Sequence, residues 1–207
     1  DGDSRVSHYA VWLYDIASSR YTACLNLLLA PEAGLADVDI RLAAIGGRSD
    51  NLKIVAQVQL SDGSTRLAVI QNGVVVEDDI VANLLGEATE VGFERISLDT
   101  GGRWLALQTS SPLGALLDES QLDTDDASDV FLLDTTSSQV TVVSVLPDSF
   151  GTNMDNPAYL GSVHATGSSV QIAFASQDAF VGADKNGGSA QIDPTDAYLW
   201  SSATNTA

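Results

Sequence analysis

Several residue types are scarce in this chain of 207 residues, and each scarcity excludes something. The single cysteine, Cys24, excludes an internal disulfide and any zinc site built on several cysteines. In a strand-like setting it is expected to be a buried thiol, with an intermolecular link or a reactive thiol as alternatives. Only 9 lysines and arginines stand against 28 acidic residues. Such a surface repels phosphate backbones and anionic lipid headgroups, so we expect no nucleic acid partner.

Long hydrophobic runs are absent too, and so are the usual signatures of catalysis. No segment approaches the roughly 18 to 20 apolar residues that a transmembrane helix needs, so we expect no membrane insertion. The two histidines, His8 and His164, are both expected to be ordinary residues. There is no Gly-x-Ser-x-Gly elbow, His-based metal cluster or phosphate-binding glycine loop. We therefore predict a non-catalytic chain, with a carboxylate pair of the glycoside hydrolase kind as the alternative.

The composition that remains is typical of a β protein. Hydrophobic residues make up 44% of the chain, enough for a substantial core. Val, Ile, Leu and Ala supply most of it and are interspersed with Ser, Thr and Gly, which suits many short strands joined by turns. We predict an all-β fold.

Two motifs recur along the chain at nearly the same interval. The first, a glycine-containing turn followed by an alternating apolar strand, occupies residues 100–110 and again 166–176. The second, an apolar strand that follows Ser-Asp or Thr-Asp, occupies residues 128–134 and again 195–201. Residues 10–15 resemble this second motif once more. Recurrence of this kind predicts tandem structural units.

Each unit is interpreted as four antiparallel strands, which predicts a partial β-propeller of about three to four blades. The chain then forms one segment, 1–207, with the end of a blade in 1–30, blades in 38–82 and 92–146, and an incomplete blade in 157–207. The strand count is two, four, four and three, with short helices or loops between blades near 31–34 and 83–90.

Such a count cannot close neatly as a ring, and an open propeller leaves its edges exposed. We therefore expect either further blades elsewhere in the parent protein or a neighbouring chain that covers the edge. The start at Asp1, without a methionine or a signal peptide, predicts a processed product or a fragment.

Individual strands are predicted from alternation and turn signals. Four aromatic residues on the recurring strand are expected to pack between blades, with a sugar-stacking or docking face as the alternative; they are Trp12, Phe131, Tyr198 and Trp200. The predicted strands are 52–60, 66–70 and 74–76, then 93–98, 103–108, 130–134 and 139–145, then 159–163, 170–175 and 197–200.

Residues 102–106 (Gly-Arg-Trp-Leu-Ala), the acidic loop 123–129 and residues 130–134 (Val-Phe-Leu-Leu-Asp) together resemble the TolB-like propeller repeats of bacterial secreted and periplasmic proteins. The match is good over 96–145 and weaker over 158–201. There Ser169 stands for Arg103 and Ser201 for Asp134.

The resemblance implies a propeller fold, an extracytoplasmic location in a bacterium, and a protein-binding or scaffolding role. Two alternatives stay open. In the first, the chain is the accessory propeller of a larger secreted hydrolase or peptidase. In the second, it is a subunit or fragment of a multi-chain assembly.

The acidic loop also suggests a metal. Ca²⁺ takes six to eight oxygen ligands and tolerates irregular geometry, which closely spaced aspartates can provide. The alternatives are a solvated acidic turn in which Asp129 caps backbone amides, and acidity that keeps the protein soluble. The expected ligands are Asp123, Asp125 and Asp129, with a weaker set in the last unit formed by Asp184, Asn186 and Asp196.

Overall fold

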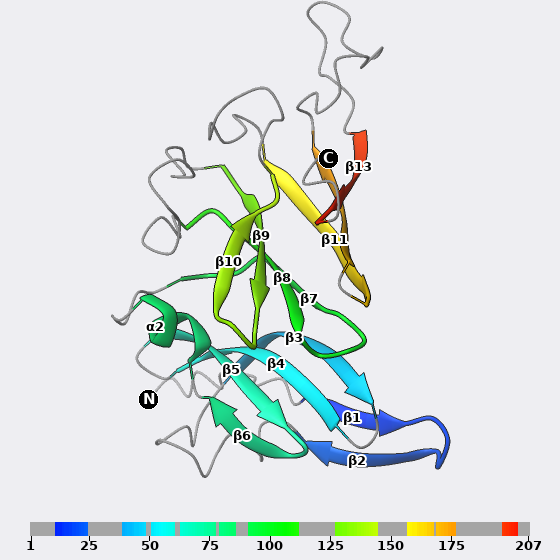
Figure 1. The fold of residues 1–207 in the computed structure, drawn as a ribbon. Coiled ribbons are helices and arrows are strands. Elements are labelled where there is room, and N and C mark those ends of the chain that lie inside the picture. The colour runs from blue at the N-terminus through cyan, green and yellow to red at the C-terminus, as the bar shows by residue number, and fades with distance from the viewer. Residues whose placement is uncertain are drawn as a thin grey trace, which may run out of the picture.

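The computed structural model shows an all-β chain built from antiparallel sheets (Figure 1). The prediction of four-stranded antiparallel sheets is confirmed. The residues it describes are 11–24, 39–48, 51–60, 63–77, 79–85, 91–111, 127–144, 157–167, 169–176 and 196–202.

These residues form four sheets, within which strands that follow one another in the chain pair antiparallel. Their strand count is two, four, four and three, as predicted. The first sheet holds β1 (Trp12–Asp15) and β2 (Arg20–Cys24). The second holds β3 (Asp39–Arg48), β4 (Asn51–Gln59), β5 (Thr65–Gln71) and β6 (Val74–Glu77). The third holds β7 (Arg95–Leu98), β8 (Trp104–Thr109), β9 (Asp129–Asp134) and β10 (Gln139–Val142). The fourth holds β11 (Ala158–Thr166), β12 (Ser169–Ser176) and β13 (Asp196–Ser201).

The sheets follow one another in chain order, from the β1–β2 hairpin at the bottom of Figure 1 to β13 at the top. The first strands of the second, third and fourth sheets are neighbours, because β7 contacts both β3 and β11. The outermost strands β6 and β10 lie on the opposite side of the view. The chain therefore lays each of these sheets against the previous one and begins all three from the same side.

Three apolar cores separate the four sheets. Val11 and Leu13 pack with Ile54 between the first and second sheets. Val55, Leu67, Leu105, Phe131 and Leu133 belong to the core between the second and third. Ala106, Val130, Leu132, Ile172 and Trp200 belong to the core between the third and fourth. Each inner sheet is thus buried on both faces, as the run of buried side chains along the whole of β9 shows.

Turn and capping residues join the strands of the second sheet and the helix that follows it. Asn72 and Gly73 both adopt positive φ between β5 and β6, which is what a two-residue hairpin of Asn-Gly type requires. Helix α2 (Ile80–Leu85) begins slightly before the predicted short helix or loop. The Asp79 carboxylate caps it by accepting hydrogen bonds from the amides of Val81 and Ala82. Within the described residues, no helix has the length and hydrophobicity to cross a membrane.

The alignment predicted from the turn motif is wrong by one position on the strands themselves. It matches buried Leu105 with exposed Gln171. In the structure Leu105 pairs with Leu133, and the equivalent pair in the fourth sheet is Ile172 with Trp200. A slip of one residue exchanges the two faces of a strand, so the turn motif assigned the wrong face to each residue of β12.

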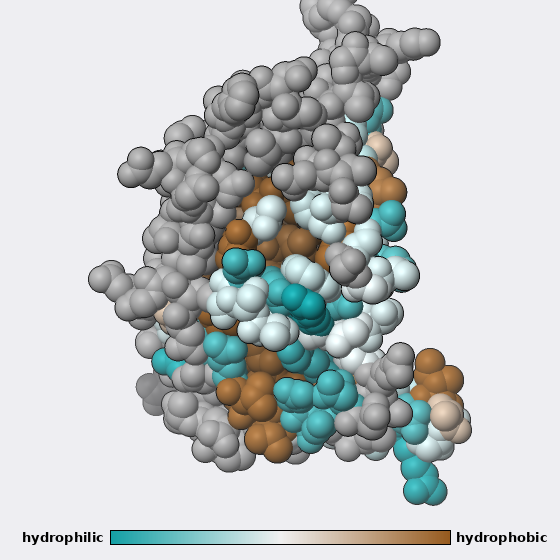
Figure 2. All heavy atoms as spheres, in the orientation of Figure 1, coloured by the Kyte–Doolittle hydropathy of each residue, from teal (hydrophilic) through white to brown (hydrophobic). Residues whose placement is uncertain are grey.

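The expectation that Trp12 packs between blades is also wrong. Phe131 and Trp200 are buried and Tyr198 is half-buried, but Trp12 is 53% exposed. Val11 and Leu13 point toward the second sheet, and Trp12 lies on the opposite face of the first sheet. Hydrophobic atoms also lie uncovered at the tip of the β1–β2 hairpin and over β6 (Figure 2).

Candidate binding cleft

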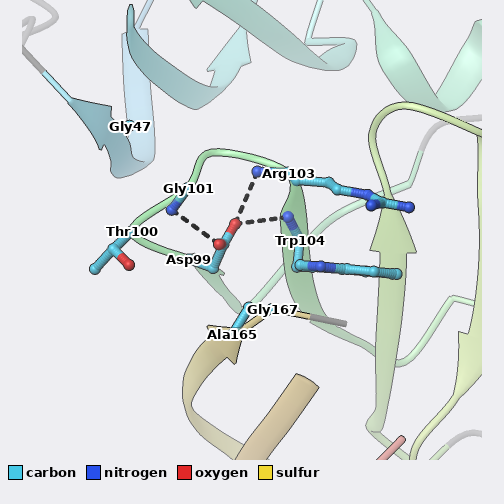
Figure 3. Close-up of a pocket in the computed structure, with 8 residues that line it drawn as sticks. All are labelled: Gly47, Asp99, Thr100, Gly101, Arg103, Trp104, Ala165 and Gly167. Carbon is cyan, nitrogen blue, oxygen red and sulfur yellow. Dashed lines mark hydrogen bonds between the residues drawn. The ribbon is translucent and has the colours of Figure 1, made fainter. Parts of the chain in front are cut away.

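A cleft of about 480 Å³ lies where three successive sheets meet at the ends of their first strands. The second sheet contributes Gly47 from the end of β3. The third contributes the turn between β7 and β8, and the fourth contributes Ala165 and Gly167 from the end of β11 and the turn after it (Figure 3). The cleft is lined by Gly47, Asp99, Thr100, Gly101, Arg103, Trp104, Ala165 and Gly167.

Asp99 organises the turn that forms the middle wall. Its carboxylate accepts hydrogen bonds from three backbone amides, those of Gly101 (2.8 Å), Arg103 (2.8 Å) and Trp104 (2.7 Å). The side chain replaces a backbone acceptor here, as aspartates in turns commonly do. Gly102 completes the turn with φ of 72°, a conformation that side chains other than glycine rarely adopt.

The second and third sheets meet closely at this corner. The Gly47 amide donates to the Thr100 carbonyl oxygen at 3.0 Å. Any Cβ at Gly46 would clash with the Asp99 carbonyl oxygen, so a glycine is required for the two sheets to approach. This hydrogen bond and this close contact hold two walls of the cleft together.

Arg103 and Trp104 extend side by side from the turn (Figure 3). The guanidinium carbon lies 4.6 Å from the centre of the Trp104 ring, within the range of a cation–π contact. Arg103 also makes a two-pronged pair with Asp134 at the end of β9, from Nε to Oδ1 at 3.0 Å and from Nη2 to Oδ2 at 2.6 Å. The Arg103 side chain remains 53% exposed, so its other N–H groups can donate to a ligand.

Asp134 is held as a carboxylate by its neighbours. The hydrogen bonds from Arg103 lower its pKa well below the usual range, and those from the Thr136 amide and the Ser137 hydroxyl act in the same direction against the opposing effect of burial. The same pair raises the pKa of Arg103. The guanidinium therefore has a fixed position and a permanent charge.

This arrangement has the chemistry of a binding site. It offers a positioned guanidinium, an indole ring and the backbone of glycine-rich turns. Planar guanidinium groups recognise carboxylates and carbonyl oxygens, and Trp and Arg are enriched among residues that dominate binding energy.

The structure places two of the predicted metal ligands, and it places them inside sheets. Asp129 begins β9, is fully buried, and its Oδ1 accepts a hydrogen bond from the Ser144 hydroxyl at 2.6 Å. Asp196 begins β13 and is half-buried. They occupy equivalent positions, opposite Thr109 and Ser176, but in separate sheets. Asp123, Asp125, Asp184 and Asn186 lie outside the described residues.

Within the described part of the chain, no group of three or more His, Cys, Asp or Glu side chains could hold a metal ion. His164 forms a local hydrogen bond with Thr166, 3.1 Å between Nε2 and Oγ1, as expected of an ordinary histidine. His8 lies outside the described residues.

The cleft is not evident from the sequence alone. Gly101 and Gly102 indicate a turn, and Arg103 and Trp104 mark a repeat, but neither signal indicates a binding site. One signal was available, because an aspartate shortly before a pair of glycines is typical of a side-chain-capped turn. Nothing in the sequence indicates that Gly47 and Gly167 come to the same place.

The fold and the cleft define a class, an all-β protein of stacked antiparallel sheets with a cleft where the corners of three successive sheets meet. Comparison with models of protein families finds no matching family, and comparison with curated proteins finds no match.

Proposed function

We propose that the chain is a non-catalytic binding module of the β-propeller type, whose cleft takes a segment of a protein partner. One observation carries the proposal: the corners of three successive sheets converge on a single cleft that displays Arg103. Sheets that start from the same side and stack in chain order are the arrangement of propeller blades, and strands β3, β7 and β11 are then the innermost ones.

The chemistry of the cleft favours a polypeptide ligand. An extended peptide presents carbonyl oxygens and carboxylates, which the free N–H groups of Arg103 can bind. The Trp104 ring beneath the guanidinium restricts its motion, so less conformational entropy is lost on binding. The net charge of −19 disfavours polyanions such as nucleic acids over the rest of the surface.

An extracytoplasmic location in a bacterium is part of the same proposal. It rests on the resemblance of residues 96–145 to TolB-like repeats and on no feature of the fold.

The test is a selection of displayed peptides on the immobilised chain, followed by titration of the selected peptides against two variants. Thr100→Trp fills the cleft from an exposed position. Val76→Trp adds the same ring at an exposed position on β6, outside the cleft. We expect Thr100→Trp to weaken binding at least tenfold and Val76→Trp to leave it unchanged. Equal binding by all three proteins would show that the peptides bind elsewhere, and the proposal would fail.

A further inference from the structure

The third and fourth sheets repeat one strand pattern, so their faces can be compared position by position. We call the side of a sheet that looks toward the next sheet in the chain its forward face, and the opposite side its backward face. Ala106 and Leu132 lie on the forward face of the third sheet and are buried under the fourth. Their equivalents on the fourth sheet are Ala173 and Leu199.

The forward face of the fourth sheet is uncharged over its described residues and is exposed. Leu199 is 57% exposed, whereas Leu132 at the equivalent position is 3% exposed. None of the described residues on this face is Asp, Glu, Lys or Arg, although the chain carries 28 acidic residues. By alternation from the pairing, its described side chains are those of Tyr159, Ser162, His164, Thr166, Ser169, Gln171, Ala173, Ala175, Ala197, Leu199 and Ser201.

The first sheet presents the opposite kind of face. The sequence repeat aligns Trp12 with Phe131 and Tyr198, and Tyr14 with Leu133 and Trp200. These partners lie on backward faces, against the preceding sheet. Trp12 and Tyr14 are instead about half exposed. Together with Tyr21 they form a cluster of edge-to-face rings, with centroids 5.9 Å and 5.2 Å from that of Tyr21.

We propose that these two faces bind each other between two copies of the chain, head to tail. The aromatic backward face of the first sheet of one copy packs on the small, uncharged forward face of the fourth sheet of the other. The interface continues the stacking that already joins the sheets within one chain, and it does not depend on what the cleft binds.

The packing of the fourth sheet on the third, inside one chain, shows which residues the packing between two copies requires. The half-buried Tyr198 and the buried Trp200 pack in one core with Trp104 and Ala106 of the third sheet. Trp12 and Tyr14 are expected to meet Gln171 and Ala173 of the second copy in the same way. Small residues at positions 161, 173 and 175 leave room for the rings.

Two copies fit this interface in number as well as in chemistry. Each copy has one face of each kind, so the contact is heterologous and closes only if the rotation completes a ring. The described residues of two copies form eight sheets, within the range of about four to eight blades in closed propellers. Because the described residues of the two faces carry no charged side chain, the charge of −19 on each copy does not have to be buried in the interface.

The first experiment measures the mass of the full chain by sedimentation and light scattering over a range of concentrations. We expect twice the 21.6 kDa of one chain. Leu199→Glu and Trp12→Glu each place a charge on one of the two faces, and we expect each to yield monomers that keep a cooperative melt. Val76→Glu is the matched control, because Val76 is 56% exposed on β6, away from both faces, and it should remain dimeric.

Mixing the two monomeric variants tests the head-to-tail geometry. Leu199→Glu retains a sound aromatic face and Trp12→Glu a sound forward face, so an equimolar mixture should form one heterodimer. An interface made of like faces predicts no complex in this mixture. A folded wild-type monomer at all concentrations, or a dimer that both charged variants leave intact, overturns the proposal.

Discussion

The third and fourth sheets are built on one strand pattern but differ in how completely it is buried. Equivalent residues pair in the same register in the two sheets. The third sheet is covered on both faces, has its fourth strand β10, and is pinned at the corner by Arg103 and Asp134. The fourth has Val170 and Ser201 at those corner positions and one uncovered face. The shared pattern therefore sets the stacking, while the corner pair is particular to the third sheet.

The largest effect is expected at Phe131, the largest of the described side chains that the stack buries completely. Phe131 on β9 is fully buried, and its equivalent Tyr198 on β13 is half-buried. We expect Phe131→Ala to cost about 3 to 5 kcal/mol of unfolding free energy because it opens a cavity between two sheets. Tyr198→Ala should cost roughly half as much, since less of its surface is buried. Denaturant unfolding at one protein concentration measures both, and equal losses would contradict the comparison.

The corner pair should give the next largest difference. Asp134→Ala removes the acceptor for Arg103, the Thr136 amide and the Ser137 hydroxyl. We expect a loss of about 2 kcal/mol, limited by the solvent around the half-exposed arginine. Ser201→Ala at the equivalent position should cost clearly less. A larger loss for Ser201→Ala would show that the corner does not distinguish the two sheets.

Acid should remove the stabilisation that the Asp134 carboxylate contributes. The pKa of Asp134 is lower in the folded chain than in the unfolded one, so its stabilising effect is present at neutral pH. The effect declines as the pH falls below about 4, where the unfolded carboxylate takes up its proton. The difference in unfolding free energy between wild type and Asp134→Asn should therefore shrink from about pH 5 toward the acid limit. A difference independent of pH over this range would assign it to packing instead.

The acidic segments offer the smallest expected effect. If residues 123–129 bind Ca²⁺ as the sequence suggests, millimolar Ca²⁺ should raise the melting temperature by about 2 to 4 °C relative to excess chelator. Asp125→Ala should abolish this rise, and Asp184→Ala should reduce it less. Identical melting in Ca²⁺ and chelator would leave the acidity as surface solvation.

Most strands could be predicted because alternation and turn residues are local signals. β3 could not, since a bulge between Ile40 and Leu42 breaks its alternation and Gly46-Gly47 resembles a turn. Gly46 is there for a different reason, the close approach of the Asp99 carbonyl oxygen from the third sheet. A contact of this kind depends on the stacking, which no local pattern contains.

The register of the repeat failed for a similar reason. The segment that joins the first strand to the second is longer in the fourth sheet than in the third. In the fourth sheet it separates the paired residues Val163 and Ile172, and in the third it separates Leu98 and Leu105. A matching Thr-Gly in both turns suggested a spacing that the strands do not follow. The cleft was beyond prediction because its walls come from positions near 47, 100 and 166, which only the folded stack brings together.

Sheets that touch only their neighbours open one at a time, from the ends of the stack inward. The amides of β9, buried on both sides, should therefore exchange with solvent more slowly than those of β13. When the fourth sheet opens, the cleft loses the wall formed by Ala165 and Gly167. A ligand that touches this wall holds the fourth sheet closed, so binding in the cleft and the local opening of the C-terminal sheet are one linked equilibrium.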